Sequence, residues 1–173
     1  SWLLLGRSDE LAKPGSYLTL DAPALGPIMA VRGKDGEARA FANVCRHRGA
    51  KLLSEASGVV RGGIVCPYHA WTYELNGDLR VAREMGEGFD PTEYSLLKAH
   101  VRIFEGMIFA CTAKSPPDIE AGLEKLAPLV APFDFNNLKI AHSASYPVPA
   151  NWKLTVENYM ECYHCAPSHK DYA

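Results

Sequence analysis

The chain has 173 residues, of which 47% are hydrophobic and 22% charged, and its formal net charge is −2 at pH 7. This is the balance of a soluble globular protein, and it excludes the strongly basic surface that nucleic acids or anionic membranes attract. The apolar start, Ser1–Leu5, is too short for a membrane span or a signal segment, and Arg7 interrupts it. Five cysteines without a paired framework indicate a reducing, cytoplasmic setting.

Short runs of β-branched and aromatic residues, separated by turns, predict strands in the first two thirds of the chain. These runs are 28–32, 39–43, 63–66, 72–75 and 102–111. Asn76-Gly77 is a hairpin turn signal, and Ser115-Pro116-Pro117 marks a boundary. The expected fold class is α+β, with an antiparallel all-β domain over 1–115 and the start of a second, α+β domain over 116–173.

In the second part, the sequence predicts two helices and one strand. Residues 118–130 carry apolar side chains at helical spacing, and Asp118 is the expected N-cap. Residues 138–147 are a predicted strand. The segment from Trp152 to about Cys165 is compatible with a helix that Asn151 caps.

Two Cys–His pairs lie in the all-β part, as Cys45-x-His47 and, after eighteen intervening residues, Cys66-x-x-His69. Thiolates suit iron–sulfur clusters, and a histidine pair on one iron raises the reduction potential above that of an all-Cys cluster. The pattern therefore predicts a Rieske [2Fe-2S] centre, with both cysteines on one iron and both histidines on the other. Zinc is the alternative, although zinc fingers usually keep the Cys pair and the His pair together.

The residues beside these pairs fit a cluster site. Gly62-Gly63 allows a close approach of the backbone, and backbone N–H groups aimed at the sulfurs would raise the potential further. For Tyr68 and Trp71, shielding of the cluster by packing and a direct electronic role are both open.

A second group of metal-ligating residues follows near the end of the chain. On a continuous helix Glu157, Glu161 and His164 would lie on one face, and His169 would return after Pro167 ends the helix. Two histidines and an acid with open positions are the ligand set of non-haem Fe(II) oxygenases. Cys162-x-x-Cys165 also matches a redox dithiol, but packing beside the iron ligands is the favoured interpretation.

Together these motifs resemble the large (α) oxygenase subunit of the Rieske non-haem iron oxygenases, over nearly the whole chain. The matching stretches are Trp2-x4-Arg7, Pro14-Gly15-x-Tyr17, "VRGKDGEARAFANVCRHRGA", "CPYHAWTY" and "NWKLTVENYMECYHCAPSH". The resemblance implies that His164 and His169 bind a mononuclear iron, with an Asp well downstream as third ligand. It implies that Glu161 bridges the cluster of one subunit to the iron of the next; the alternative is that Glu161 itself binds the iron.

The resemblance also implies a function. Such a mono- or dioxygenase component takes electrons from NAD(P)H through a flavin and iron–sulfur reductase and uses O₂ to hydroxylate a C–H bond of a small molecule. It works as a head-to-tail homotrimer in the cytoplasm. Glu161 within "ENYMECYHC" resembles the branch that demethylates quaternary ammonium compounds such as glycine betaine, proline betaine and carnitine, with release of formaldehyde.

Two other functions stay open at this stage. One is that of an aromatic-ring hydroxylating α subunit. The other is that of a Rieske ferredoxin, a pure electron carrier, which would need only residues 1 to about 115 and has no use for a second metal site over 151–169.

Overall fold

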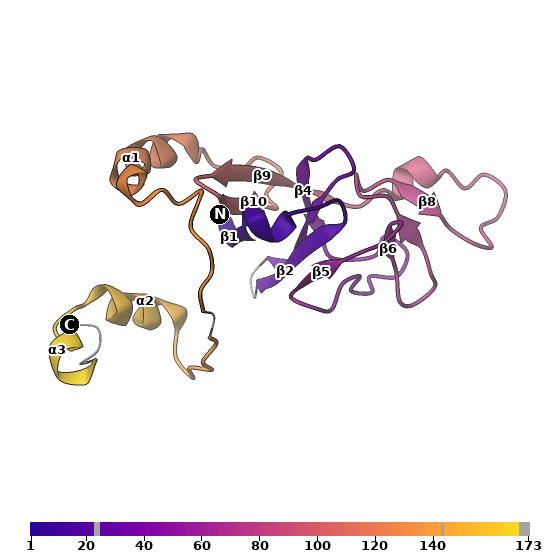
Figure 1. Ribbon diagram of the computed structural model, residues 1–173. Coiled ribbons are helices and arrows are strands. Elements are labelled where there is room, and N and C mark those ends of the chain that lie inside the picture. The colour runs from indigo at the N-terminus through magenta and orange to yellow at the C-terminus, as the bar shows by residue number, and fades with distance from the viewer. Residues whose placement is uncertain (23–24, 143, 170–173) are drawn as a thin grey trace. The chain divides into compact units, whose positions relative to one another are not determined.

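The structure is a computed structural model that describes residues 1–22, 25–142 and 144–169 (Figure 1). It divides into two compact units, Ser1–Leu138 and the segment from Lys139 onward. The first unit holds the strands, and the second holds two helices. The domain boundary predicted at 115/116 stays a prediction.

The first unit is built on two antiparallel sheets, as predicted. The larger sheet has the strand order β1-β10-β9-β4-β3-β2-β5, and the smaller one β6-β7-β8. The strands of the larger sheet are β1 (Leu3–Arg7), β2 (Ser16–Ala22), β3 (Gly26–Arg32), β4 (Ala38–Ala42), β5 (Ser57–Val59), β9 (Lys98–Phe104) and β10 (Met107–Cys111). Those of the smaller sheet are β6 (Ile64–Val65), β7 (Thr72–Tyr73) and β8 (Leu79–Val81). Short helices η1 (Ser8–Leu11), η2 (Pro91–Tyr94) and η3 (Ala131–Phe133) and the helix α1 (Glu120–Val130) complete the unit.

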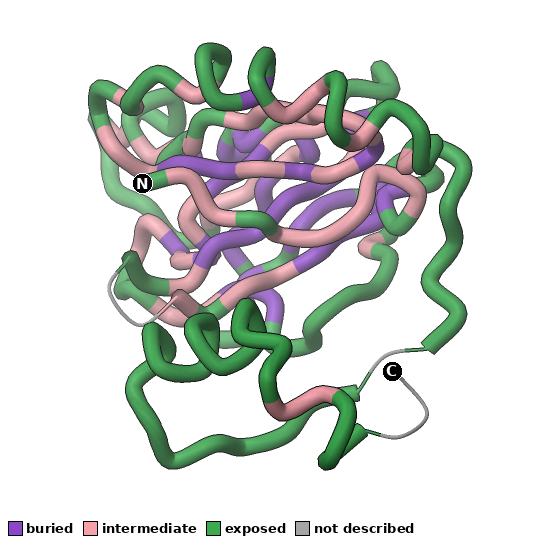
Figure 2. Tube along the Cα trace, turned by 90° about the vertical axis from the view of Figure 1, so that its left-hand side faces the viewer, coloured by how far each residue is buried: buried purple, intermediate pink, exposed green. Residues whose placement is uncertain are grey.

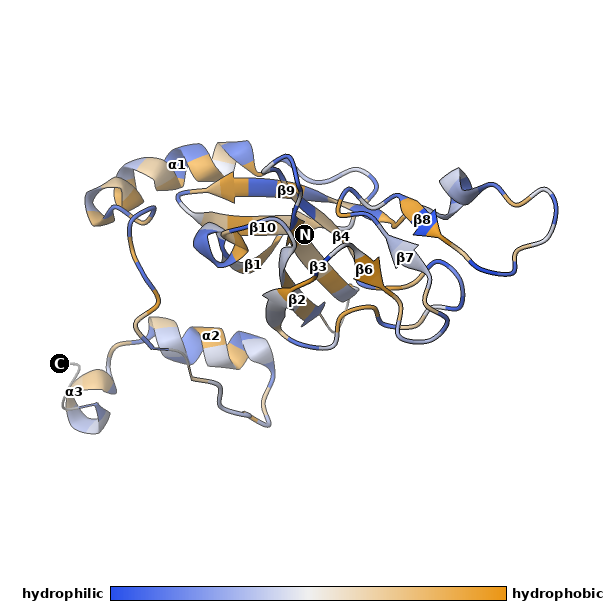
Figure 3. Ribbon diagram, turned by 45° about the vertical axis from the view of Figure 1, so that its right-hand side comes forward, coloured by the Kyte–Doolittle hydropathy of each residue, from blue (hydrophilic) through white to orange (hydrophobic). Residues whose placement is uncertain are grey.

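Strand β3 is buried on both of its faces, because successive side chains point to opposite sides of a sheet. Met29 and Val31 belong to the core that the two sheets share, whereas Ile28 and Ala30 face the two smaller cores beside β10. All four side chains are fully buried. Figure 2 shows the buried residues gathered on the strands, and Figure 3 shows β3 and β6 as strongly apolar segments.

The two ends of β1 hold the segment that leaves the sheet. The indole Nε1 of Trp2 donates to the Pro117 carbonyl at 2.8 Å, and Nη2 of Arg7 donates to the carbonyls of Phe135 (2.8 Å) and Leu138 (2.9 Å). These bonds give the Trp2-x4-Arg7 pattern a structural role, since the pair fixes both ends of residues 117–138.

The helix predicted over 118–130 is present with a later start. Helix α1 begins at Glu120, and the Asp118 carboxylate accepts a hydrogen bond from the Glu120 N–H at 2.9 Å. An ion pair between Arg102 Nε and Glu120 Oε1, 2.6 Å apart, ties the first turn to β9. The run predicted over 102–111 is a hairpin of β9 and β10, which turns at Glu105-Gly106.

The second unit contains α2 (Trp152–Met160) and the single-turn α3 (Cys165–Ser168). The Asn151 cap is confirmed, because its side-chain oxygen accepts the Lys153 N–H at 3.0 Å. The prediction of one helix reaching Cys165 was wrong: α2 ends at Met160, and Glu161 is extended, with φ −98° and ψ 112°. Pro167 lies inside α3 and does not end the longer helix that the sequence predicted.

The prediction of a strand over 138–147 was also wrong for the residues that the structure describes, 138–142 and 144–147. No pairing with another strand forms along these stretches, so their backbone has no ladder to join. None of the helices in the described part of the chain is long and apolar enough to cross a membrane.

Candidate metal centres

The two predicted cluster loops share one hydrogen-bond pattern. The Cys45 N–H donates to the carbonyl of Ala50, five residues on, at 2.8 Å, and the Cys66 N–H donates to the carbonyl of Trp71, again five residues on, at 2.7 Å. In each loop the cysteine carbonyl accepts the N–H of the fourth residue after it, at 3.0 Å. The sequence therefore builds the same tight loop twice, with the histidine at its tip.

The fourth residue after the cysteine in each loop adopts a left-handed backbone conformation. Gly49 has φ +72° and Ala70 has φ +57°. Glycine adopts the left-handed conformation readily, whereas a residue with a Cβ pays an energy cost to do so. The second loop thus holds Ala70 in a conformation that the first loop gives to glycine.

The four predicted cluster ligands converge at one end of the first unit. The His47 and His69 ring centroids are 4.9 Å apart, and the Cys45 side chain is near enough to Cys66 to help raise the pKa of its thiol. Both cysteines are 3% exposed and belong to the core between the sheets, whereas His47 is half-buried and His69 is exposed. Two buried thiols beside two outward imidazoles are the donor set that a Rieske cluster requires.

Tyr73 adds a contact that the motif did not reveal. Its phenol oxygen lies 3.3 Å from Cys45 Sγ and accepts the Arg46 N–H at 3.0 Å. A cysteine that binds iron is a thiolate and has no proton to donate, so in a loaded cluster the phenol O–H would donate to the sulfur. Burial and the neighbouring Cys45 raise the pKa of Tyr73, so the phenol keeps its proton. A feature of the sequence could have indicated this contact, because Tyr73 is an aromatic residue close after the second loop and its side chain is buried.

Burial is the main cause of the pKa shifts of Cys66 and His47. It raises the pKa of the Cys66 thiol, while backbone hydrogen bonds from Tyr68 and His69 act in the opposite direction. Burial, followed by the proximity of His69, lowers the pKa of His47 and favours the neutral imidazole that binds metals.

Glycine is needed at positions 63 and 49 for different reasons. A Cβ on Gly63 would lie 2.7 Å from the Tyr73 carbonyl oxygen, so the close approach predicted there is to strand β7. A Cβ on Gly49 would meet nothing within 4 Å. Gly63, with φ +134°, is required by both space and backbone conformation, and Gly49 by backbone conformation alone.

The second unit brings the predicted iron ligands together. Glu161 Oε2 lies 3.0 Å from His164 Nδ1, and the ring centroids of His164 and His169 are 5.4 Å apart in an edge-on arrangement. The other carboxylate oxygen of Glu161 accepts the Tyr163 N–H. These local bonds replace helical ones, which explains why α2 stops before Glu161. The hydrogen bond from His164 lowers the pKa of Glu161.

Two further residues of this segment take different positions from those expected. Glu157 lies on α2, so the shared helical face with Glu161 and His164 does not form. The Cys165 thiol has the Cys162 side chain as a hydrogen-bond partner, and its pKa is raised mainly by burial.

The donor sets fit the two predicted metal groups to different degrees. Within residues 1–22, 25–142 and 144–169, no three His, Cys, Asp or Glu side chains gather closely enough to hold one metal ion. A Rieske cluster needs two protein ligands on each iron, so Cys45, His47, Cys66 and His69 suffice. A facial iron site needs three, of which His164 and His169 would supply two.

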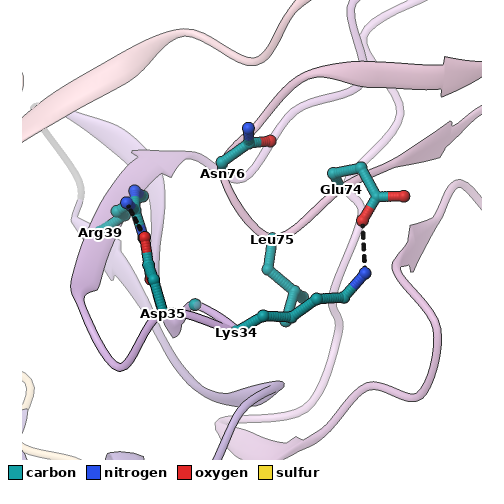
Figure 4. A pocket seen from close by; sticks show the side chains of 7 residues that line it. Lys34, Asp35, Arg39, Glu74, Leu75 and Asn76 are labelled. Atoms are coloured by element: carbon teal, nitrogen blue, oxygen red, sulfur yellow. Dashed lines mark hydrogen bonds and ion pairs between the residues drawn. The ribbon is translucent and has the colours of Figure 1, made fainter.

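A surface hollow lies between the β3–β4 and β7–β8 connections, and Figure 4 shows the residues that line it. Its charged groups are paired with one another: Lys34 Nζ lies 3.0 Å from Glu74 Oε2, and Arg39 Nη2 lies 2.5 Å from Asp35 Oδ2. Its lining includes none of the predicted metal ligands. We assign it a structural role in fixing the turn between β7 and β8.

Comparisons with known proteins agree with both centres. The Rieske [2Fe-2S] domain family matches residues 1–105, and the catalytic domain of the ring-hydroxylating alpha subunit matches residues 135–173. The chain is 43% identical over 171 residues to the glycine betaine monooxygenase oxygenase subunit of Pseudomonas aeruginosa, covering 98% of this chain and 39% of that protein. It is 41% identical over 183 residues to the carnitine monooxygenase oxygenase subunit of Acinetobacter baumannii, covering 100% and 47%.

A solved structure extends the similarity to three dimensions. The quaternary ammonium Rieske monooxygenase CntA in complex with gamma-butyrobetaine has a TM-score of 0.88 and 40% identity, over 98% of this chain and 49% of that one. The chain thus spans less than half the length of these relatives. From the paired Cys–His loops and the match over residues 1–105, the chain belongs to the Rieske [2Fe-2S] domain family.

Proposed function

We propose that the chain carries the cluster domain and part of the iron site of an oxygenase component that removes an N-methyl group from a quaternary ammonium compound. The observation that carries the proposal is the second histidine pair, His164 and His169, with the Glu161 carboxylate hydrogen-bonded to the first. An electron carrier has no use for such a pair. The similarity to glycine betaine and carnitine monooxygenase subunits supports the substrate class.

The proposed reaction balances with one O₂ and two electrons. One oxygen atom becomes the hydroxyl of an N-hydroxymethyl group, the other leaves as water, and NAD(P)H supplies both electrons through a reductase. The N-hydroxymethyl product loses formaldehyde and leaves the demethylated amine. When bound, the cluster and the mononuclear iron supply single-electron transfer and activation of O₂.

We assign Cys45, His47, Cys66 and His69 as the cluster ligands and His164 and His169 as two ligands of the mononuclear iron. Glu161 is a positioning residue that orients the His164 ring through Nδ1, as carboxylates commonly do for metal-bound histidines. Because His69 is exposed and His47 is half-buried, His69 is the ligand that faces the electron acceptor. Glu161 of a neighbouring subunit would link His69 to the iron site there.

The proposed assembly is a head-to-tail homotrimer in the cytoplasm, with a flavin and iron–sulfur reductase as electron donor. A contact between the cluster end of one subunit and the iron segment of the next is heterologous, and such contacts close into rings. The chain is similar to a quaternary ammonium Rieske monooxygenase whose structure gave insights into inter-subunit electron transfer, and this similarity supports the arrangement.

Formaldehyde release tests the function. The complete oxygenase component, with a reductase and NADH, would be assayed against glycine betaine, proline betaine, carnitine, choline and simple arenes. We expect formaldehyde in step with NADH consumption for one N-methyl cation. Oxygenated product without formaldehyde from every substrate would overturn the demethylase assignment.

Aromatic-ring hydroxylation is the second candidate. The chain is 33% identical over 174 residues to the alpha subunit of chlorobenzene dioxygenase from Cupriavidus sp., and naphthalene 1,2-dioxygenase with bound indole has a TM-score of 0.78 at 31% identity. A cis-diol from an arene in the same assay would establish it. Iron content separates both candidates from a Rieske ferredoxin, which would hold only the cluster's two irons.

A further inference from the structure

We propose that Trp71 is a positioning residue for His47, which fixes the plane of the imidazole ring and shields one of its faces from water. The proposal rests on the assignment of His47 as a cluster ligand. It separates the roles of the two histidines: His47 is held by a buried aromatic ring, whereas His69 is exposed beside an exposed one.

Trp71 connects the two cluster loops. Its carbonyl accepts the Cys66 N–H at 2.7 Å and so closes the second loop. Its indole ring reaches the first loop, where it stacks on the His47 imidazole with 4.8 Å between centroids and 9° between planes. A shift of either loop would break the parallel contact, so the indole determines where the imidazole lies.

The indole is itself held in place. Trp71 is 2% exposed, and the rings of Phe89 (5.7 Å, 70°) and Tyr94 (5.5 Å, 83°) both pack against it edge to face. These two rings also stack on each other at 4.8 Å. Edge-to-face packing is a favoured aromatic geometry. Here both packing rings belong to one segment, since Phe89 precedes η2 and Tyr94 is its last residue. Rotation of the indole would therefore disrupt the shared core.

His69 has no comparable support. Apart from His47 itself, the ring beside it belongs to Tyr68, which is 63% exposed and tilted by 30° at a centroid distance of 3.8 Å. A side chain in water is free to change rotamer, whereas a buried one in contact on several sides is not. Groups beyond the direct ligands orient a metal-bound histidine. Among the residues that the structure describes, the ring stacked on His47 is fixed by packing, whereas Tyr68 beside His69 is exposed.

The test compares variants of the complete protein with its cluster loaded. Pulsed EPR of the reduced cluster resolves the ¹⁴N couplings of two histidine ligands, and the width of each coupling reports the spread of ring orientations. We expect Trp71→Leu to broaden one of the two couplings and leave the other unchanged. Trp71→Phe keeps a flat ring and should largely restore the narrow coupling.

Tyr68→Leu is the matched control, because it removes the aromatic ring next to the other histidine. We expect it to leave the coupling that responds to Trp71→Leu unchanged. If Trp71→Leu prevents cluster loading, Tyr94→Leu serves in its place, since it retains the indole but removes one of its edge contacts. Broadening of the same single coupling is again expected.

Three results would overturn the proposal. The first is unchanged couplings in Trp71→Leu, or in Tyr94→Leu where that variant replaces it. The second is equal broadening of both, which indicates general loosening of the site. The third is a ¹⁴N coupling that is as broad in Trp71→Phe as in Trp71→Leu. That result would indicate that the volume of the indole orients the imidazole and that ring stacking does not. None of these readouts depends on turnover, so loss of the demethylase assignment would leave the test valid.

Discussion

The phenol oxygen of Tyr73 lies 3.3 Å from the sulfur of Cys45, although the two residues are 28 positions apart in the chain. Tyr73 follows the second loop on β7, and Cys45 opens the first. The phenol also accepts the Arg46 N–H, so the chain directly after Cys45 holds the donor in place. Strand β7 thus contributes the hydroxyl group that contacts a sulfur of the first loop.

Replacing Tyr73 by Phe should lower the reduction potential of the cluster. A hydrogen bond to a ligand sulfur favours the more negative, reduced state, and its loss removes that preference. A single bond worth about 1 kcal/mol corresponds to roughly 40 mV for a one-electron couple. Spectroelectrochemical titration measures the shift, and iron content serves as the control for cluster loading. An unchanged potential at full loading would show that the phenol does not tune the cluster.

The repeated loop geometry predicts opposite effects for two matched substitutions. Gly49→Ala places a Cβ on a residue with φ +72°, where no atom obstructs it, so the cost is conformational and about 1–2 kcal/mol. Ala70→Gly relieves the same strain at φ +57° and should gain up to about 1 kcal/mol, partly offset by the greater freedom of glycine when unfolded.

Thermal unfolding of the two iron-loaded variants and the wild type measures this difference. The expected order of melting temperature is Ala70→Gly at or above wild type, with Gly49→Ala below it. The reverse order would mean that the left-handed conformation is not what selects glycine in the first loop.

Much of the cluster site could be predicted from the sequence, because its ligands lie in two short motifs. The spacing of Cys45, His47, Cys66 and His69 predicted the donor set, and the structure folds both motifs into loops with the same backbone hydrogen bonds. The contacts of Tyr73 and Trp71 could not be predicted in the same way. They join residues far apart along the chain, and only the packing of the two sheets determines which rings meet.

In the second unit, the spacing of residues along the sequence did not predict the local structure correctly. Helical spacing grouped Glu157, Glu161 and His164, but the Glu161 carboxylate binds the Tyr163 N–H and the His164 ring instead. Such local side-chain bonds compete with helical ones and are invisible to a pattern of apolar residues. The apolar residues of 138–147 favoured a strand, yet a strand requires a partner, which sequence composition does not specify.

Arg7 should prove necessary for holding residues 117–138 to the sheet. In Arg7→Ala the carbonyls of Phe135 and Leu138 lose their donor, and bonds from a charged group are worth roughly 1.5–3 kcal/mol each at most. We expect faster proteolytic cleavage near η3 and faster amide exchange in α1, with the sheet unaffected. The exposed Arg61 provides the control, and equal cleavage rates in Arg7→Ala and Arg61→Ala would contradict this role.

The ion pairs of Glu74 predict an acid dependence of stability. Hydrogen bonds from Lys34 and then Arg80 lower the pKa of Glu74 in the folded protein. A lowered folded pKa stabilises the protein above the unfolded value of about 4.3, and this contribution disappears as pH falls through the folded value. The stability difference between wild type and Glu74→Gln should therefore be largest near neutral pH and shrink below about pH 4. Urea midpoints between pH 3 and 7 measure it, and a pH-independent difference would show that the charge of Glu74 contributes nothing.

Glu161→Gln tests the link between the two centres, and Glu157→Gln is its matched control. Both substitutions remove one carboxylate charge from the same segment, but only Glu161 is hydrogen-bonded to His164. In Glu161→Gln, with both metal groups loaded, the reductase should reduce the cluster at the wild-type rate. Product formation should fall by about 10²-fold or more, the scale of effect seen when a positioned acid–base group is lost. Stopped-flow reduction and single-turnover product yield separate the two steps. Because Glu157 lies on α2 away from this hydrogen bond, its variant should retain both rates; normal product formation in Glu161→Gln would remove Glu161 from the electron and proton route.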